Sequence, residues 1–126
     1  MALTWFSRSE QPIIATINSN HITLNAPAIT LLEGIDKVRL GYDQKKRIVV
    51  IGMLTRDETE DYRSREDELL SVHRQMSYVR INCTAFIDII LGEFEGLSLK
   101  VLPLKFPSYY DEKFRSIVID FNKEVE

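Results

Sequence analysis

The chain has 126 residues, of which 44% are hydrophobic, with a formal net charge of −3 at pH 7. Composition and length are those of one ordinary domain with a core of its own, so we expect a single domain over residues 1–126. The mildly acidic balance gives no global electrostatic reason to expect DNA, RNA or anionic lipid as a partner, and no apolar run approaches the roughly 18 residues of a membrane span.

The cellular compartment is predicted from the cysteine and the N-terminus. Cys83 is the single cysteine, so no intramolecular disulfide can form. The first residues lack the apolar core of a signal peptide. We therefore expect a cytoplasmic protein with no contact to a membrane.

The first elements in chain order are an aromatic pair and a β-hairpin. Trp5 and Phe6 precede a polar stretch and are interpreted either as a tail packed on the core or as an anchor for a partner. From Pro12 onward apolar residues alternate with polar ones on both sides of the turn at 18–20, which predicts two antiparallel strands.

A short helix and a second hairpin follow. Asn25 stands where a helix N-cap is expected, Pro27 lies inside the first turn, and Gly34 ends the helix. The stretches 37–42 and 48–53 then form strands around the polar turn 43–47. The first half is thus predicted to be β-β-α-β-β.

The second half repeats most of the first. The stretch 42–51 (YDQKKRIVVI) returns as 110–119 (YDEKFRSIVI), an offset of 68. An offset of 57 relates five earlier residues to their counterparts, so the second copy carries extra residues around 92–109. We expect a tandem duplication with repeats at about 12–53 and 78–121. The residues matched at an offset of 57 are Ile22, Leu24, Asn25, Ala28 and Ile29 with Val79, Ile81, Asn82, Ala85 and Phe86.

The linker at about 54–77 is acidic. Residues 56–68 contain seven acidic and three basic side chains, so the repeats themselves are close to neutral. Ser64 with Asp67 resembles a capping box, and apolar residues up to Met76 follow at helical spacing. We expect a connecting helix laid on the core, and the alternative is an acidic docking surface or a strip that mimics DNA.

The first half resembles the AbrB-like swapped-hairpin domain of bacterial transition-state regulators and antitoxins. The resemblance covers about 12–53 and, more loosely, 78–121. It implies a small barrel in which this one chain supplies both of the copies that interlock. The motifs that carry it are the strands Ile13–Asn18 and Ile22–Asn25, a short helix ending in Leu32-Glu33-Gly34, the strand Lys37–Leu40 and the hairpin start Tyr42–Lys45.

The chain departs from the family at the positions that would contact DNA. DNA-binding members carry Gly-Arg at the first hairpin turn and arginines in the short helix, whereas this chain has Asn18-Ser19-Asn20-His21 and then Ile29 and Thr30. The family's DNA-binding residues therefore cannot be transferred. Phosphate contacts would have to come from other basic side chains: Lys37, Arg39, Lys45, Lys46, Arg47, Arg80, Lys100, Lys105, Lys113 and Arg115.

Catalytic and metal-binding motifs are not found. His21 and His73 have no metal-ligand spacing with Cys83 or with a carboxylate, and there is no phosphate-binding glycine loop or nucleophile elbow. Cys83 follows Asn82 at an expected helix start, where a thiol is either activated or simply a small packed residue. We expect no enzyme activity and no cofactor.

Three functions remain open. The first is a non-catalytic regulatory or protein-interaction module that binds a protein partner or associates with itself through Trp5, Phe6, Tyr109 and Tyr110. The second is a DNA-binding regulator that uses chiefly Lys45, Lys46, Arg47, Arg80, Lys113 and Arg115. The third is an enzyme or small-ligand binder with a pocket between the repeats, lined by polar groups such as Tyr42, Tyr110, His21 or His73.

The predicted fold class is α+β. Two tandem β-β-α-β-β-like repeats are expected to form one pseudo-symmetric small barrel or sheet core, joined by the acidic helical linker. The expected shared core is Ile22, Leu24, Leu32, Val38, Leu40, Val49, Ile51, Val79, Ile81, Phe86, Ile89, Val101, Ile117 and Ile119.

Overall fold

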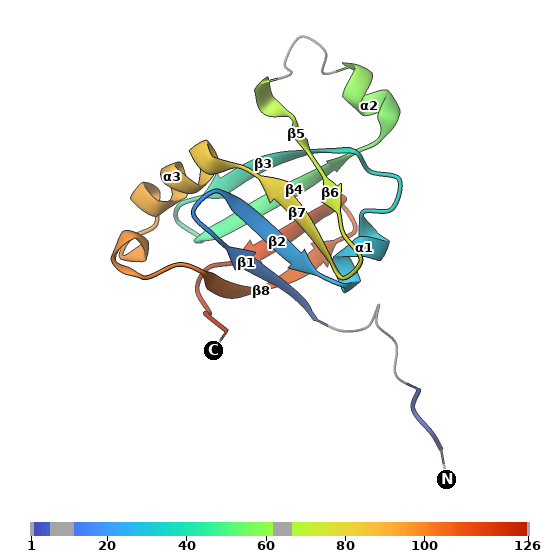
Figure 1. Ribbon diagram of the computed structural model, residues 1–126, viewed down its shortest axis with the longest axis horizontal. Helices are drawn as coiled ribbons and strands as arrows, with labels where there is room; N and C mark the ends of the chain where they lie inside the picture. The colour runs from blue at the N-terminus through green and yellow to red at the C-terminus, as the bar shows by residue number, and fades with distance from the viewer. Residues whose placement is uncertain (1, 6–11, 62–66, 126) are drawn as a thin grey trace.

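A computed structural model describes residues 2–5, 12–61 and 67–125 of the chain (Figure 1). Antiparallel strands dominate these residues, accompanied by short helices. In chain order the elements are β1 (Ile13–Ile17), β2 (His21–Asn25), α1 (Pro27–Leu31), β3 (Lys37–Asp43), β4 (Ile48–Leu54), α2 (Arg56–Asp61), β5 (Leu70–Ser71), β6 (His73–Arg74), β7 (Tyr78–Asn82), α3 (Thr84–Glu93), the 3₁₀ turn η3 (Leu97–Leu99), β8 (Leu104–Asp111) and β9 (Ser116–Asp120).

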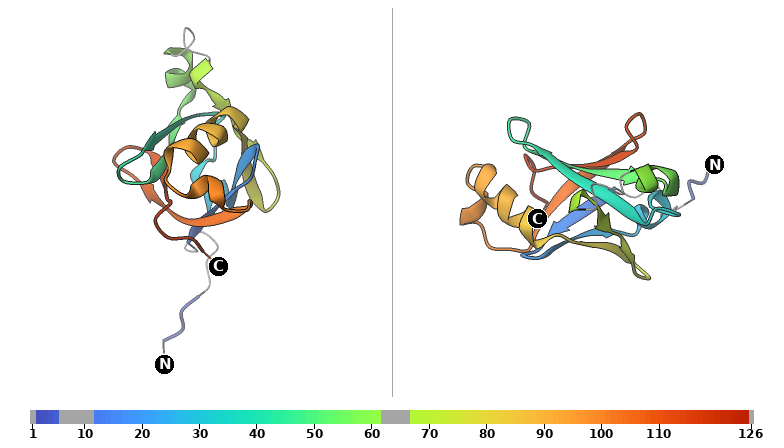
Figure 2. Two further views of the ribbon diagram at one scale, coloured as in Figure 1. Left: turned by 90° about the vertical axis from the view of Figure 1, so that its left-hand side faces the viewer. Right: turned by 90° about the horizontal axis from the view of Figure 1, so that it is seen from above.

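The strands form one sheet that curls into a nearly closed barrel. Their order is β5-β3-β4-β9-β8-β1-β2-β7-β6, and neighbouring strands are antiparallel. Only Val72 separates β5 from β6, and its amide donates to the Asp36 carbonyl at 3.0 Å. The two ends of the sheet therefore meet at this residue (Figures 1 and 2).

The helices lie at the ends of the barrel. α3 crosses one open end, where Ile87 and Ile90 are buried against the core, and α1 lies toward the other end (Figure 2). Because a helix over the end of a barrel shields the apolar interior from water, α3 completes the core that the strands begin. The expected α+β class and small barrel-like core are thus confirmed.

Alternation along the strands places one side chain in two inside the barrel. Ten of the predicted core residues are fully buried: Ile22, Leu24, Leu32, Val38, Val49, Ile51, Val79, Ile81, Ile117 and Ile119. Leu40 and Phe86 are half-buried against this core. The predictions for Ile89 and Val101 are wrong, because Ile89 lies on the outer side of α3 and Val101 on the exposed chain after η3.

Asn25 does not cap α1, contrary to the prediction. Residue Ala26 occupies the cap position without a side-chain hydrogen bond. The Asn25 side chain instead accepts from the Ile14 amide and donates to the Pro12 carbonyl, both at 2.9 Å. Asn25 is the last residue of β2, so its amide group points back to the start of β1 and joins these two strands.

The predicted linker helix at 64–76 is also wrong for the residues that the structure describes there. β5 pairs with β3 through Leu70 opposite Val38, and β6 pairs with β7 through His73 opposite Arg80. The helix of this region, α2, comes earlier, at 56–61. Backbone groups along the edges of β3 and β7 need hydrogen-bond partners, and this requirement overrides the helical spacing of the apolar side chains.

Two strand pairings are centred on residues that the sequence repeat matches. Thr23 lies opposite Arg80 in β2–β7, and Val50 lies opposite Val118 in β4–β9. The offsets are 57 and 68, the same two at which the sequence repeats. An antiparallel pair in which each residue faces its own counterpart has a local two-fold axis between them.

The two long hairpins end in the same turn. Arg47 and Arg115 both have positive φ, 54° and 47°. The side chain of Asp43 accepts from the Lys46 amide at 3.1 Å, and that of Asp111 accepts from the Phe114 amide at 3.3 Å. The predicted turn at 43–47 thus recurs at 111–115 with the same hydrogen bond, as expected for aspartate at the start of a turn.

Candidate functional site

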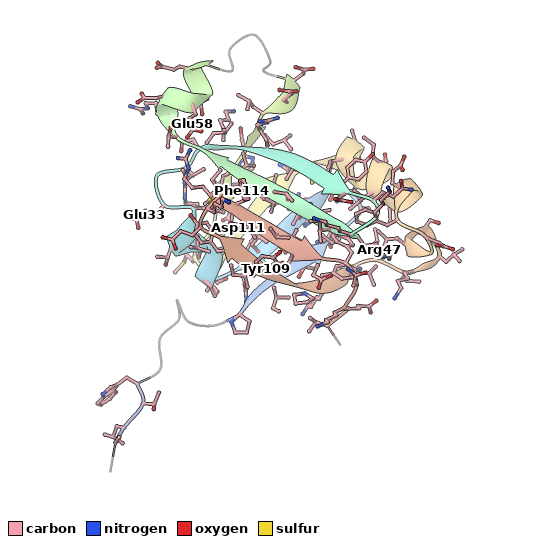
Figure 3. The ribbon with its side chains drawn as sticks, turned by 180° about the vertical axis from the view of Figure 1, so that it is seen from behind. Glu33, Arg47, Glu58, Tyr109, Asp111 and Phe114 are labelled. Carbon is pink, nitrogen blue, oxygen red and sulfur yellow. The ribbon has the colours of Figure 1, made fainter. Side chains whose placement is uncertain are left out.

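A groove of about 670 Å³ crosses the outer face of β3, β4, β9 and β8. Figure 3 looks onto this face, on which Tyr109, Asp111 and Phe114 follow the β8–β9 hairpin. We call it the outer groove. Its lining residues are Arg39, Leu40, Gly41, Lys46, Ile48, Val50, Gly52, Met53, Leu54, Glu58, Tyr109, Asp111, Phe114, Arg115, Ser116 and Val118.

A row of four residues runs straight across the middle of the outer groove. Gly41 lies opposite Val50, Val50 opposite Val118, and Val118 opposite Tyr109. Val118 is only 5% exposed, whereas Tyr109 is 56% exposed at the end of the row. The other end is Gly41, where an added Cβ would meet no atom within 4 Å. The Tyr109 side chain therefore projects from the surface at one end of the row, and the surface at Gly41 has free space at the other end.

A second row lies two residues along the strands. Arg39 lies opposite Gly52, Gly52 opposite Ser116, and Ser116 opposite Asp111. Arg39 and Asp111 thus occupy the two edge strands at one level, with a glycine and a small hydroxyl residue between them. The Ser116 hydroxyl is buried and donates to the Phe114 carbonyl at 2.9 Å. This row carries opposite charges on opposite sides of the groove.

The apolar character of the outer face has a signal in the sequence. The run Ile48-Val49-Val50-Ile51 is apolar on both faces of its strand, and so is Ile117-Val118-Ile119. Continuous apolar runs are typical of strands that are covered on both sides. In the part of the chain that the structure describes, the inner face of these strands packs into the core. The centre of their outer face forms the floor of the groove. Val50, Val118 and Phe114 were not predicted as site residues, although the two valines lie within these runs.

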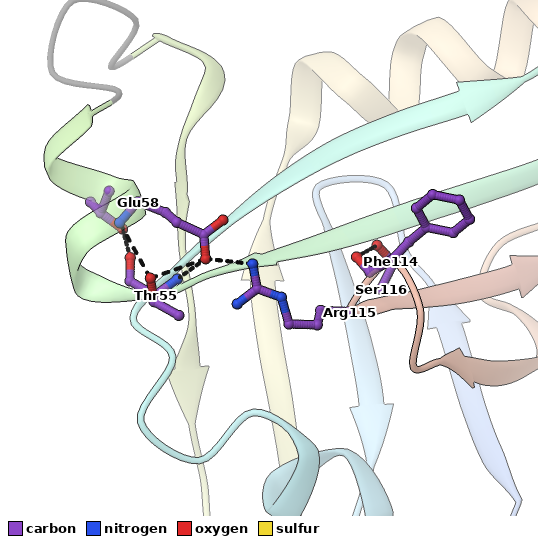
Figure 4. A network of polar contacts seen from close by, with 6 residues as sticks. Thr55, Glu58, Phe114, Arg115 and Ser116 are labelled. Carbon is purple, nitrogen blue, oxygen red and sulfur yellow. Dashed lines mark hydrogen bonds and ion pairs between the residues drawn. The ribbon is translucent and has the colours of Figure 1, made fainter.

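A polar network closes the end of the groove beside α2 (Figure 4). The hydroxyl and amide of Thr55 donate to the Glu58 carboxylate at 3.0 and 3.3 Å, and the Glu58 amide donates back to the Thr55 hydroxyl at 3.3 Å. This is a capping box at the start of α2. The same carboxylate oxygen is 2.8 Å from Nη2 of Arg115. The network ties the β8–β9 turn to α2.

The electrostatics of this network favour an ionised Glu58. Burial of the carboxyl acts to raise its pKa, but the hydrogen bonds from Thr55 and Arg115 and the charge of Arg115 outweigh it. The pKa of Glu58 is therefore lowered on balance. Glu58 and Arg115 form a polar border at one end of the groove, beside its apolar floor.

The four aromatic residues predicted to bind a partner lie in different surroundings. Tyr109 is exposed in the outer groove, whereas Tyr110 points to the opposite face of β8 and packs against the core. Successive residues of a strand face opposite ways, so only Tyr109 of the two lines the outer groove, although both tyrosines border a smaller cleft of about 300 Å³ beside α1. Trp5 is exposed, and Phe6 lies outside the described residues. Phe114, which we did not predict, is 67% exposed at the rim of the groove.

The basic residues predicted to bind DNA do not gather at one place. Lys45, Lys46 and Arg47 lie at the β3–β4 turn, whereas Lys113 and Arg115 lie at the β8–β9 turn. These turns diverge from one another (Figure 2, right). Arg47 also donates to the Glu95 carbonyl at 2.8 Å and lies over the Phe94 ring, 5.6 Å from its centroid.

Arg80 belongs to a different surface, on the far side of the barrel. A groove of about 520 Å³ lies there over β8, β1, β2 and β7. Pairing places Lys105 beside Thr16, Thr16 beside Thr23, and Thr23 beside Arg80. Burial and the charge of Arg80 lower the pKa of the nearby His21. The described lining contains no carboxylate: Ile14, Thr16, His21, Thr23, Leu24, Asn25, Ser77, Tyr78, Arg80, Lys105 and Val125.

Cys83 is a packed residue in this structure. It is buried, its Sγ lies 3.4 Å from the Ile81 carbonyl oxygen, and burial raises its pKa to about 11. A thiol with so high a pKa is a poor nucleophile at neutral pH. Cys83 lines a cleft of about 500 Å³ between β3 and α3, together with Leu40, Asn82 and Phe86.

The polar groups expected to line a ligand pocket do not converge. Tyr42 packs edge to face on Phe86 and Phe94, with ring centroids 6.2 and 6.1 Å away, whereas His21 lies on the far side of the barrel.

Over the described ranges no three His, Cys, Asp or Glu side chains are grouped closely enough to bind a metal ion. No helix in this part of the chain has the length and apolarity needed to cross a membrane.

Comparisons with known proteins gave no match, so a function can be proposed only from the fold and its grooves. No family model, no curated protein and no solved structure matches the chain.

Proposed function

We propose that this chain is a non-catalytic protein-interaction module of AbrB-like, duplicated architecture, and that the outer groove is its contact surface. The central row of the groove carries this proposal. It combines an apolar floor, Val50 and Val118, with an exposed tyrosine at one end. Interface centres are enriched in aromatic and depleted in charged side chains. We place the protein in the cytoplasm on the basis of its sequence.

Tandem duplication is part of the proposal, and the pairing registers support it. β2–β7 and β4–β9 are centred on the matched pairs Thr23–Arg80 and Val50–Val118. The hairpins β3–β4 and β8–β9 also share one register, since Tyr42 faces Val49 and Tyr110 faces Ile117. Adding 57 to the bounds of β1 gives 70–74, the residues from β5 to β6.

The test is capture of partners by the purified chain at about 0.5 M salt with nuclease, so that screening suppresses contacts with phosphates. Tyr109→Asp and Phe114→Asp alter the groove. Leu99→Asp and Val101→Asp introduce the same charge at exposed apolar residues outside it. We expect proteins captured by the parent to be lost from the groove variants and kept by the two controls. Equal capture by all four variants would place the contact elsewhere.

Nucleic-acid binding is a second candidate, favoured by the row from Lys105 through Thr16 and Thr23 to Arg80. Hydroxyl and basic side chains in a groove without carboxylates suit a phosphate backbone. The test is fluorescence anisotropy with single-stranded and duplex DNA at about 0.05 and about 0.2 M salt. Arg80→Glu and Lys105→Glu should abolish binding, whereas Lys45→Glu and Lys113→Glu should leave it unchanged. The opposite order of effects would assign binding to the hairpin turns.

A further inference from the structure

We propose that the occupant of the outer groove is a second copy of this chain, packed face to face as a two-fold symmetric dimer. The inference rests on the proposed function, since it takes the outer groove as an interaction surface. It adds the identity of the partner and the residues that face one another. The residues at the two ends of each cross-strand row are complementary to one another.

The two-fold axis of this dimer runs parallel to the strands, between the two facing sheets. Such an axis exchanges the edge strands, so that β8 of one copy lies over β3 of the other and the β4–β9 centres face each other. Residues stay at their own level along the strands. Each residue of a row therefore meets the residue at the other end of the same row in the second copy.

The central row is complementary to itself under this operation. Tyr109 of one copy is placed over Gly41 of the other, and the valines face valines. The ring rises from the surface at one end of the row, and the absence of a side chain leaves room at the other. Two such contacts form, one on each side of the axis.

The second row is complementary in charge. Arg39 and Asp111 stand at its two ends, so the operation places Asp111 of one copy over Arg39 of the other, twice. The residues between them, Gly52 and Ser116, are small and let the facing chains approach. A two-fold axis perpendicular to the strands, through the central row, would instead bring Tyr109 against Tyr109 and Gly41 against Gly41.

The size of the face sets the strength of such a dimer. Twisted sheets pack face to face about 10 Å apart with their strands nearly aligned, and both copies have the same twist. Four strands of about seven residues give a face of about 20 by 23 Å. This is small for a specific interface, so we expect a dissociation constant in the micromolar range.

Sedimentation velocity from about 5 to about 500 μM tests the dimer directly. The parent should shift from monomer to dimer over this range. Gly41→Trp fills the open end of the row, and because its Cβ has free space the folded monomer should tolerate it. Gly41→Trp and Tyr109→Ala should each weaken the dimer about tenfold or more. Leu99→Ala is the control and should change nothing.

A charge-swap experiment identifies the facing residues. Arg39→Asp and Asp111→Arg each bring like charges together at both contacts, so each should be monomeric alone. Mixing the two variants restores opposite charges at both contacts and should restore the dimer, as should the double variant. Lys45→Asp, the same charge change outside the groove lining, should dimerise like the parent.

The outcomes separate this inference from the proposed function. A parent chain that stays monomeric to about 500 μM, or a mixture of the two charge variants that fails to dimerise, overturns the second copy as occupant. If the groove variants still lose captured proteins, the function stands and the occupant is a different protein. If capture is also unaffected by groove variants, the proposed function falls as well.

Discussion

Val50 lies opposite Val118 where β4 meets β9, and each valine has the same place in its own hairpin. Their neighbours on the outer strands differ: Val50 is paired with Gly41 and Val118 with Tyr109. The two hairpins are therefore alike at the centre of the face and unlike at its edges. Because the two edges differ, a partner can distinguish one half of the surface from the other, which it could not do on an exact repeat.

The Glu58 carboxylate should make stability depend on pH. Its pKa is lowered in the folded chain, so its contribution is present above the unfolded pKa and is lost as pH falls through the folded value. Glu58→Gln should lower the free energy of unfolding by about 0.3–1 kcal/mol at pH 7, as for an exposed ion pair. Urea unfolding should show this difference shrinking as the pH falls below the ordinary glutamate pKa of 4.5. Glu60→Gln, on the exposed side of α2, is the control, and a difference that persists in acid would contradict the assignment.

Cys83 should react with a thiol reagent only when the chain unfolds. Its pKa of about 11 and its burial keep it protonated and shielded at pH 8. Absorbance after addition of a disulfide reagent should show a rate at least about 100-fold below that in denaturant. The double variant Cys83→Ala with Ala85→Cys moves the thiol to an exposed residue and should react at once. Fast labelling of the native parent would refute the buried thiol.

Phe94 should be among the residues most sensitive to truncation. It is 1% exposed and packs edge to face on Phe121, 5.0 Å between ring centroids. Phe94→Ala should cost about 3–5 kcal/mol, because the cavity adds to the lost transfer free energy. Thermal unfolding followed by circular dichroism measures the loss. Leu99→Ala, at a residue that is 87% exposed, should change stability by less than about 0.5 kcal/mol.

Asn25 offers a test between a strand link and a helix cap. Asn25→Ala should cost about 1–2 kcal/mol, because it leaves the Ile14 amide and the Pro12 carbonyl without their partner. Asn25→Asp keeps an acceptor for Ile14 but has no donor for Pro12, so its loss should be intermediate. Aspartate is as good as asparagine at an N-cap. Equal stability of the Asp variant and the parent in urea would therefore favour the cap.

The hairpins could be predicted because their information is local. Alternation and turn residues lie within a few positions of one another, and the aspartate turn at 43–47 was correctly placed. β5 and β6 could not be predicted from local sequence. These two-residue strands are held by hydrogen bonds to the edges of β3 and β7, and β3 lies far away in sequence. The helical spacing around Val72 was real, but the distant edges determined the structure.

The outer groove depends on a register that no local pattern contains. Tyr109 was predicted from the sequence as a protein-interaction residue, but its row is set by the pairing of Val50 with Val118. Phe114 was missed because a turn residue between Lys113 and Arg115 looks solvent-exposed and inert. Only the uninterrupted apolar runs of β4 and β9 indicated that their outer face is more than a solvated surface.

The pairing of β1 with β8 has a consequence during synthesis. Ile17 faces Leu104, so the first strand meets this neighbour only after 87 further positions have been added. At about 5–20 residues per second, a ribosome needs about 4–17 s for that distance. During this time the free edge of β1 has no partner strand, although β2 can already pair with β7, and this edge is open to chaperones and to other nascent chains. The yield of folded protein in the cell should therefore respond to translation speed as well as to the stability of the finished barrel.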